Sequence, residues 1–251
     1  MPAPDAATIR QIVERHVELW NAHDKNAWLA HWRSAVPGDV SMYDPVGTPP
    51  KPGRPAFEAP WDTMNAPWAL SIEHLVVNGT EAAVLMRNVG EVGGTGVVLP
   101  SIEIWRFGDD GSLHARFSFE TPAADDAERV RRDEIRTIME RAHELWNAHD
   151  RDAWLEVWRE AVPGDMTLDD RATGEVRHGF DECRVETWEI HNATTRFATR
   201  FLVVCGNEAA MAVDNVIDLG PQSVTVTSIE TYEFGDDASL YERNWYDLPA
   251  S

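Results

Sequence analysis

This chain contains an internal sequence repeat. The hexapeptide Leu-Trp-Asn-Ala-His-Asp occupies residues 19–24 and returns unchanged at residues 145–150. At the same spacing, Ala-Val-Pro-Gly-Asp stands at residues 35–39 and again at residues 161–165. A one-residue insertion then changes the spacing, and the new spacing holds to the end of the chain. Chance similarity does not keep one register over a whole domain, so the sequence predicts a single fold repeated in tandem.

The boundaries of the two copies follow from this register. Ser-Ile-Glu at residues 101–103 matches residues 228–230 late in each copy. A charged stretch joins the copies, and we place the division so that residues 1–122 form the first domain and residues 123–251 the second. Both lengths are ordinary for a domain with its own core.

Charge and composition restrict the partners. The chain has 43 acidic residues against 22 Lys and Arg, a formal net charge of -21. Such a field repels phosphate backbones and anionic membranes, so neither nucleic acid nor a membrane is an expected partner. No apolar run is long enough to cross a bilayer, and the first ten residues lack a signal-peptide core. Cys183 and Cys205 both lie in the second copy, which argues against a disulfide framework and favours the cytoplasm.

Helical periodicity dominates the start of the first copy. Apolar residues from Ile9 to Trp20 recur at helical spacing, and His16 lies inside this stripe, facing the core. A second helix is predicted over residues 25–35, ended by Pro37 and the glycine that follows.

The rest of the copy has the pattern of an antiparallel sheet. Residues 39–44 alternate between apolar and polar, a loop follows over residues 49–53, and a short helix is predicted over residues 56–64. Glycine-rich and Asp-Gly turns separate further strands at residues 71–77, 82–89, 97–107 and 113–120. This order predicts an α+β fold, with helices packed on the concave face of a curved sheet.

Several carboxylates share a strand face with apolar side chains. These are Asp44 and Glu103 in the first copy and Asp170 and Glu230 in the second. A carboxylate in an apolar setting loses hydration, which raises its pKa. Two such acids in one pocket can divide into a base and a proton-bearing donor, the equipment needed to move a proton beside a carbonyl. The alternative is structural, because an inward acid at a sheet end can simply hydrogen-bond the backbone.

Structural alternatives hold for the other polar and aromatic residues too. By itself, His16 is more simply a core histidine whose hydrogen bonds are satisfied than a catalytic residue. The repeated hexapeptide reads as a structural turn, in which Asn21 or Asp24 caps the second helix. The tryptophans at helical spacing are most simply core residues: Trp20, Trp28 and Trp32.

The motifs of the first copy resemble a known family. Residues 14–24, the Asp-Pro-Val-Gly segment at 44–47, Gly53-Arg54 and residues 102–107 are similar to ketosteroid isomerases of the NTF2-like (SnoaL-like) superfamily. The resemblance covers nearly all of the first copy and, more weakly, the second. It implies two cone-shaped, cystatin-like α+β domains in tandem, each with a pocket between its sheet and its helices.

The resemblance also implies roles for individual residues. Asp44 occupies the place of the base that shuttles a proton between carbons of the steroid. Glu103 occupies that of a protonated acid that donates to the dienolate oxygen. His16 aligns with a tyrosine that gives the second hydrogen bond. The implied pocket is lined by Trp20, Met42, Trp61, Trp105 and Phe117.

The second copy departs from this pattern. Ala142 stands in the place of His16, and Arg171 in that of the proline after the catalytic aspartate. Its last strand has polar residues where the first copy has alanine and phenylalanine: Glu242, Asn244 and Tyr246. A pocket in the second copy would therefore be more polar, with Asp170, Glu230 and Tyr246 as candidate site residues.

These observations lead to an acid–base enzyme as the first hypothesis. It would abstract a proton beside the carbonyl of a hydrophobic ketone of steroid or polyketide type and isomerise it. No metal cluster, phosphate loop or nucleophile elbow is visible, so we expect neither a metal nor another cofactor. The alternatives are a non-catalytic binder of hydrophobic small molecules, or a polyketide cyclase, dehydratase or epoxide hydrolase on the same scaffold.

Because members of the superfamily commonly dimerise, we expect a pseudo-dimer within one chain, with a homodimer of such chains as the alternative.

Overall fold

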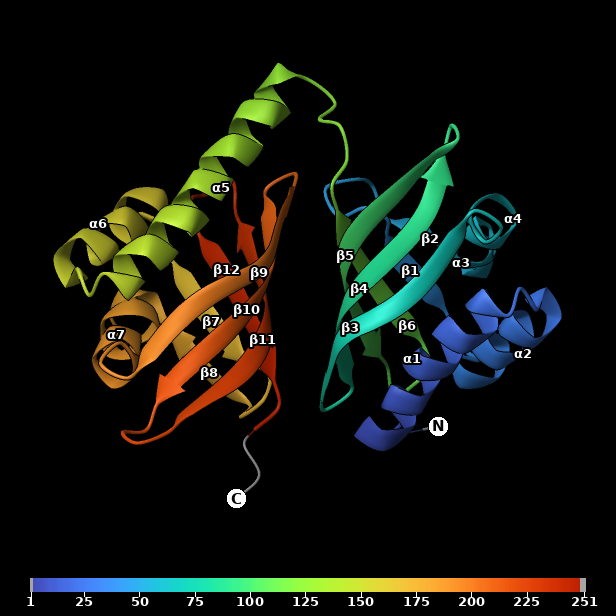
Figure 1. The fold of residues 1–251 in the computed structure, drawn as a ribbon, viewed down its shortest axis with the longest axis horizontal. Helices are drawn as coiled ribbons and strands as arrows, with labels where there is room; N and C mark the ends of the chain where they lie inside the picture. Colours follow the sequence, from blue (N-terminus) through green and yellow to red (C-terminus); the bar gives the residue numbers. More distant parts are fainter. Residues whose placement is uncertain (1, 249–251) are drawn as a thin grey trace. The chain divides into compact units, whose positions relative to one another are not determined.

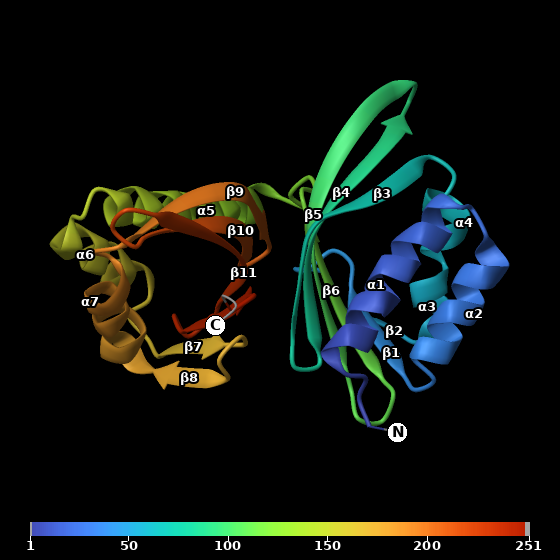
Figure 2. The same cartoon turned by 60° about the horizontal axis from the view of Figure 1, so that its bottom comes forward.

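The computed structural model describes residues 2–248 and divides the chain into two units, Met1–Glu120 and Thr121–Ser251. In each unit the helices lie on one face of a curved sheet (Figures 1 and 2). The elements of the first unit are α1 (Ala6–Asn21), α2 (Lys25–Ala35), β1 (Val40–Tyr43), β2 (Lys51–Pro52), α3 (Arg54–Glu58), α4 (Pro60–Met64), β3 (Trp68–Asn78), β4 (Glu81–Val92), β5 (Thr95–Phe107) and β6 (Leu113–Phe119).

The second unit repeats this order. Its elements are α5 (Asp126–Asn147), α6 (Arg151–Ala161), β7 (Met166–Asp170), β8 (Glu175–His178), η1 (Asp181–Glu186), α7 (Thr187–His191), β9 (Thr195–Cys205), β10 (Glu208–Asp218), β11 (Ser223–Phe234) and β12 (Leu240–Tyr246). The strand orders also agree: β2-β1-β6-β5-β4-β3 in the first sheet and β8-β7-β12-β11-β10-β9 in the second. The predicted tandem α+β fold is confirmed.

Both sheets are antiparallel except at one place. β1 runs parallel to β6, and β7 runs parallel to β12. The pairing of β1 with β6 places Met42 opposite Ala115, and the pairing of β5 with β6 places Glu103 opposite Phe117. The end of β1, where Asp44 follows, is thereby brought to the strands that carry the other candidate residues.

Two details of the first unit differ from the sequence expectation. The helix expected over residues 56–64 is two short helices, because Pro60 begins a new one, a position where proline is well tolerated. Part of the expected loop is β2, which pairs with β1 through Met42 and Lys51.

The repeated hexapeptide attaches the helices to the sheet. Asp24 is the residue that caps α2, since its side chain accepts the Ala27 N–H at 2.9 Å. Asn21 instead bonds β3 twice, donating to the Leu70 carbonyl at 2.8 Å and accepting its N–H at 2.9 Å. The equivalent Asn147 makes both bonds in the second unit. The hexapeptide is therefore structural in both units.

The one-residue insertion lies in η1. Gly53 and Gly179, both with positive φ, still keep the earlier spacing, whereas Trp61 and Trp188 already keep the later one. The extra residue between them is accommodated as a π-helical turn over Asp181–Glu186. Such turns place side chains where a regular helix would not, and they occur often at functional sites.

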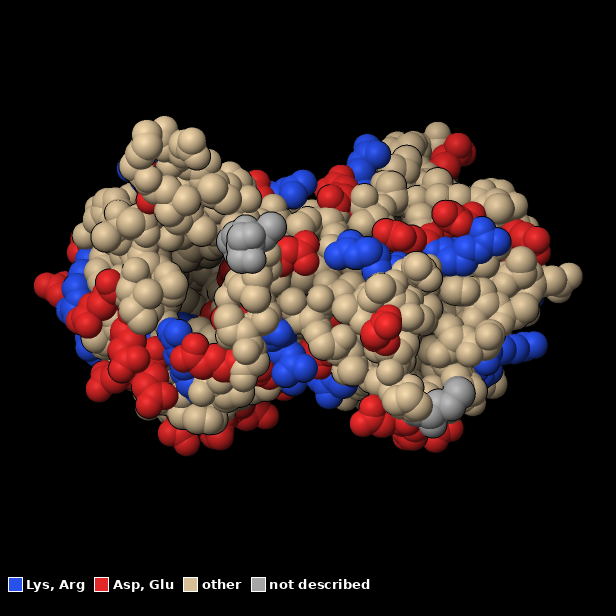
Figure 3. Space-filling view, turned by 90° about the horizontal axis from the view of Figure 1, so that it is seen from below, with Lys and Arg blue, Asp and Glu red and all other residues tan. Residues whose placement is uncertain are grey.

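The surface carries the charge expected from the composition. Asp and Glu side chains gather on the face shown in Figure 3. Cys183 and Cys205 are both buried, and within residues 2–248 neither forms a disulfide. No helix within residues 2–248 has the length and apolar character that crossing a membrane would require.

Candidate functional site

The first unit holds a cavity of about 160 Å³ between its helices and its sheet. Seven of the residues singled out from the sequence line it: His16, Trp20, Met42, Asp44, Glu103, Trp105 and Phe117. Trp61, also expected in the lining, is not among the residues that line this cavity. Its ring packs against two that are, Trp20 and Trp28, with ring centroids 5.2 Å from each.

His16 is held as a neutral donor. The indole N–H groups of Trp28 and Trp32 both donate to its Nδ1, at 2.9 Å and 3.1 Å. A nitrogen that accepts hydrogen bonds carries no proton, so these bonds assign the ring proton to Nε2. Burial lowers the pKa of His16 to about 3, which keeps the ring neutral. Among the described residues, Nε2 has no hydrogen-bond partner, and the side chain lines the cavity.

Glu103 is held by two residues that sequence reasoning missed. Ser101 Oγ donates to Glu103 Oε1 at 3.1 Å, and Asn88 Nδ2 donates to Ser101 Oγ at 3.0 Å. The second unit has the same arrangement with Asn215 and Ser228. The signal was present in the sequence, because both pairs keep the register of the repeat.

Burial makes Glu103 a weak acid. Glu103 is only 8% exposed, and this burial raises its pKa to about 7. The hydrogen bond from Ser101 works against the rise, whereas the negative charge of Asp44 adds to it. At neutral pH a large share of Glu103 therefore keeps its proton, with Oε2 left to present it.

The carboxylate of Asp44 is partly exposed at the cavity. Its side chain is 24% exposed, and Lys51 Nζ lies 3.1 Å from its Oδ2. Within residues 2–248, Oδ1 accepts no hydrogen bond. The carboxylate is thus held by one oxygen and has free lone pairs on the other. The cavity brings together a free carboxylate and two neutral groups able to donate a proton.

Removing the Ser101 hydroxyl should raise the pKa of Glu103 further. The Ser101→Ala variant loses a hydrogen bond that stabilises the charged form, while the burial that opposes this form remains. A ¹³C NMR titration of the glutamate carboxyls in the full chain would measure the change. The matched variant Ser228→Ala removes the same bond in the second unit and should leave Glu103 unaffected. A lower or unchanged pKa in Ser101→Ala would contradict this account.

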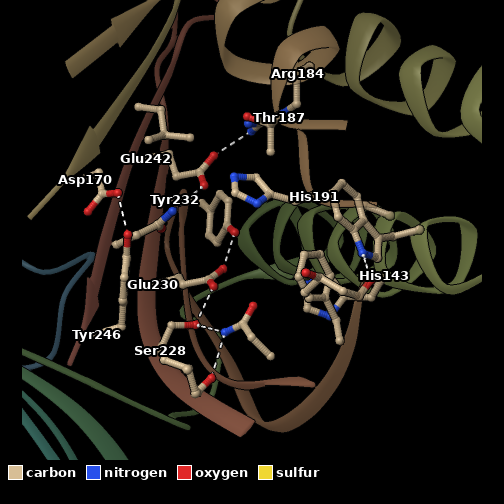
Figure 4. Close-up of a pocket in the computed structure, with 18 of the residues that line it drawn as sticks. His143, Asp170, Arg184, Thr187, His191, Ser228, Glu230, Tyr232, Glu242 and Tyr246 are labelled. Carbon is tan, nitrogen blue, oxygen red and sulfur yellow. Dashed lines mark hydrogen bonds and ion pairs between the residues drawn. The ribbon is translucent and has the colours of Figure 1, made fainter. Parts of the chain in front are cut away.

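The second unit holds a different cavity, of about 260 Å³ (Figure 4). The predicted residues Asp170, Glu230 and Tyr246 all line it. Asp170 is already engaged, since its Oδ1 accepts two backbone N–H groups of the β7–β8 turn and its Oδ2 accepts the Tyr246 hydroxyl at 2.7 Å. Asp170 therefore holds a turn, and unlike Asp44 it has no free oxygen.

Glu230 accepts a hydrogen bond on each oxygen. Ser228 Oγ donates to Oε1 at 2.6 Å, and the Tyr232 hydroxyl donates to Oε2 at 2.5 Å. Figure 4 shows the carboxyl group between these two donors. Burial raises the pKa of Glu230, and the charge of Glu242 raises it further. The hydrogen bonds from Ser228 and Tyr232 act against this rise.

An ion pair absent from the first unit closes one end of the second cavity. Arg184, from the π-helical turn η1, donates to Glu242 Oε2 at 2.7 Å, and both residues are almost fully buried. The guanidinium also lies 4.0 Å from the centre of the Trp158 ring. In the register of the repeat, the first unit has Phe57 and Ala115 at these two positions. The buried charge pair of the second unit therefore has no counterpart at these positions of the first.

Comparisons with known proteins agree with the fold. The sequence model of the SnoaL-like domain family matches residues 13–116. A comparison with curated protein sequences found no match.

Three solved structures illustrate the similarity. The epoxide hydrolase/cyclase-like enzyme SalBIII of salinomycin biosynthesis is 18% identical, covers 43% of this chain and 88% of its own, and has a TM-score of 0.36. An NTF-2 like protein of Burkholderia xenovorans LB400 is 18% identical, covers 49% of this chain and 89% of its own, and has a TM-score of 0.37. A protein with a cystatin-like fold from Methylobium petroleophilum PM1 is 18% identical, covers 50% of this chain and 84% of its own, and has a TM-score of 0.38. With the family match and the shared topology of its halves, this chain is a tandem pair of NTF2-like units, the first of which is a SnoaL-like domain.

Proposed function

We propose that the first unit is an acid–base enzyme that isomerises a hydrophobic ketone. Asp44 would take a proton from the carbon beside the carbonyl and return it elsewhere on the substrate. Glu103 and His16 would donate hydrogen bonds to the oxygen that becomes an enolate. The observation that carries this proposal is the free Oδ1 of Asp44 in one cavity with two neutral proton donors.

The charges of the site suit this reaction. Before proton transfer the cavity holds one negative charge, on Asp44, because His16 and protonated Glu103 are neutral. After transfer it again holds one, now on the substrate oxygen. The charge moves instead of being created, and donors fixed in an apolar cavity stabilise it without having to reorganise. Burial keeps His16 neutral, so the ring adds no positive charge to the cavity.

The size of the cavity limits the substrate. About 160 Å³ is below the roughly 300–1,000 Å³ of sites that enclose a drug-sized ligand. Its walls are largely aromatic, with Trp20, Trp28 and Phe117 among them. We therefore expect a small cyclic ketone, or the terminal ring of a larger steroid or polyketide whose remainder stays outside.

Hydrogen exchange would test the reaction directly. The full chain is incubated in deuterated water with a panel of cyclic and steroid ketones, and deuterium at the carbons beside the carbonyl is followed by mass spectrometry. Incorporation above the buffer rate on at least one ketone is the expected result. No incorporation on any ketone would overturn the proposal. Turnover of a parallel epoxide panel in that case would assign the same acid and base to ring opening.

A further inference from the structure

We propose that the second cavity is a binding site for a small organic cation, such as a quaternary ammonium group. This inference is independent of the reaction proposed for the first unit, because it concerns another cavity with other residues. It follows from the charges that face the cavity, from the rings that line it, and from the absence of the Glu242 carboxylate and the Tyr232 hydroxyl at the matching positions of the first unit.

The charged side chains around the cavity leave one carboxylate unpaired. Arg184 is committed to Glu242. Arg177 pairs with Glu175 at 2.9 Å and also donates to the Thr187 hydroxyl. Glu230, only 8% exposed, has no ion-pair partner in the part of the chain that the structure describes. The buried set of Glu230, Glu242 and Arg184 therefore carries one net negative charge when Glu230 is ionised.

The remaining ionisable groups do not supply the missing positive charge. Burial lowers the pKa of His143 to about 4, so it is neutral at pH 7. Burial also lowers the pKa of His191. Asp170, which carries a further negative charge, is satisfied by the β7–β8 turn and by Tyr246. An unpaired buried carboxylate is costly, and this cost is the reason that burial raises the pKa of Glu230. A cationic ligand beside Glu230 would offset the cost and stabilise the carboxylate form.

The walls of the cavity suit the apolar part of such a ligand. Trp146, Trp154, Trp158 and Phe197 line it together with Tyr232. Aromatic faces attract cations through the ring quadrupole, most strongly where water is excluded. One such cation–π contact is already present in this unit, since Arg184 lies over the Trp158 ring. A soft cation such as an alkylammonium loses less hydration on entering than a bare ammonium or a metal ion would.

The first unit lacks this combination at matching positions. Trp105 replaces Tyr232, and Ala115 replaces Glu242. Its buried acid, Glu103, has a free oxygen and can protonate, whereas both oxygens of Glu230 accept hydrogen bonds from donors of the sheet. The chain therefore contains its own control for a cation site.

A pair of ligands of equal shape tests the inference. Choline and 3,3-dimethylbutan-1-ol differ in that a neutral carbon replaces the ammonium nitrogen, and calorimetry on the full chain would compare their binding. We expect choline to bind at least about tenfold more tightly than the neutral alcohol. Glu230→Gln, which keeps the shape of the side chain, should remove this preference. Glu103→Gln, its counterpart in the first unit, should leave it unchanged.

The proposal would be overturned by equal binding of the two ligands, by no binding of choline, or by an undiminished preference in Glu230→Gln. Thermal unfolding and near-UV circular dichroism of each variant would establish that it is folded. Chemical-shift changes of the Trp146 and Trp154 indole N–H groups on adding choline would place the ligand in this cavity. Shifts confined to tryptophans of the first unit would also contradict the assignment. Failure here leaves the exchange reaction of the first unit untouched, so the two proposals fail separately.

Discussion

The Asp44→Asn variant is expected to lose the exchange activity by about 10²–10⁴-fold, the usual contribution of a positioned general base. The asparagine amide keeps the shape of the side chain but cannot take up a proton from carbon. The cavity, with His16 and Glu103 as donors, remains intact. Deuterium incorporation into the best ketone of the panel would be compared at equal protein concentration, together with the binding of an unreactive analogue, which should change by only a few fold.

The second unit provides the matched control for this variant. Asp170 stands at the position of Asp44 in the repeat, but its oxygens are taken by the β7–β8 turn and by Tyr246. The Asp170→Asn variant should therefore keep full exchange activity, even though its own unit loses some stability. Activity surviving in Asp44→Asn, or disappearing in Asp170→Asn, would remove Asp44 from the role of base.

The Glu103→Leu variant is expected to lose about 10²–10³-fold, as enzymes do when one donor to a developing oxyanion is removed. The wild-type protein should also show a characteristic pH dependence. Only protonated Glu103 can donate, so activity should be present below its pKa of about 7 and should fall as the pH rises through that value. Rates measured from about pH 5 to about pH 9 would show this decline.

A conservative variant separates hydrogen bonding from general damage to the cavity. In Glu103→Gln the amide donates at every pH, so the decline above about pH 7 should disappear while part of the activity remains. Glu230→Gln, the equivalent change in the second unit, should keep the wild-type profile. If Glu103→Gln also keeps it, the decline belongs to another group and Glu103 is not the donor.

Much of the architecture follows from local patterns. The register of the repeat predicted two units, and the turn before α2 and the Pro-Gly stop after it predicted α2 over the residues that form it. Strand alternation predicted which side chains of β12 share a face, and Glu242, Asn244 and Tyr246 do line one cavity. These features were predictable because a strand or helix imposes its periodicity on neighbouring residues, whatever the rest of the chain does.

The chemistry of the two cavities was decided by tertiary contacts. Asp44 and Asp170 hold the same place in the repeat, yet one has a free oxygen and the other has none, because the backbone after each strand turns differently. His16 is neutral because it is buried, and its proton is on Nε2 because two indoles from α2 donate to its Nδ1. Arg184, which lines its cavity and bonds Glu242, lies in the π-helical turn that accommodates the inserted residue.

The sequence by itself thus determined the repeat, the fold class and the faces of the strands, all of which depend on residues near one another in the chain. The tertiary structure decided which carboxylate is free, which oxygen carries a proton and which charge is paired. Those properties depend on distances of about 3 Å between side chains of separate elements, since hydrogen bonds and desolvation act only at that range. Two copies of one fold therefore have two cavities of different chemistry.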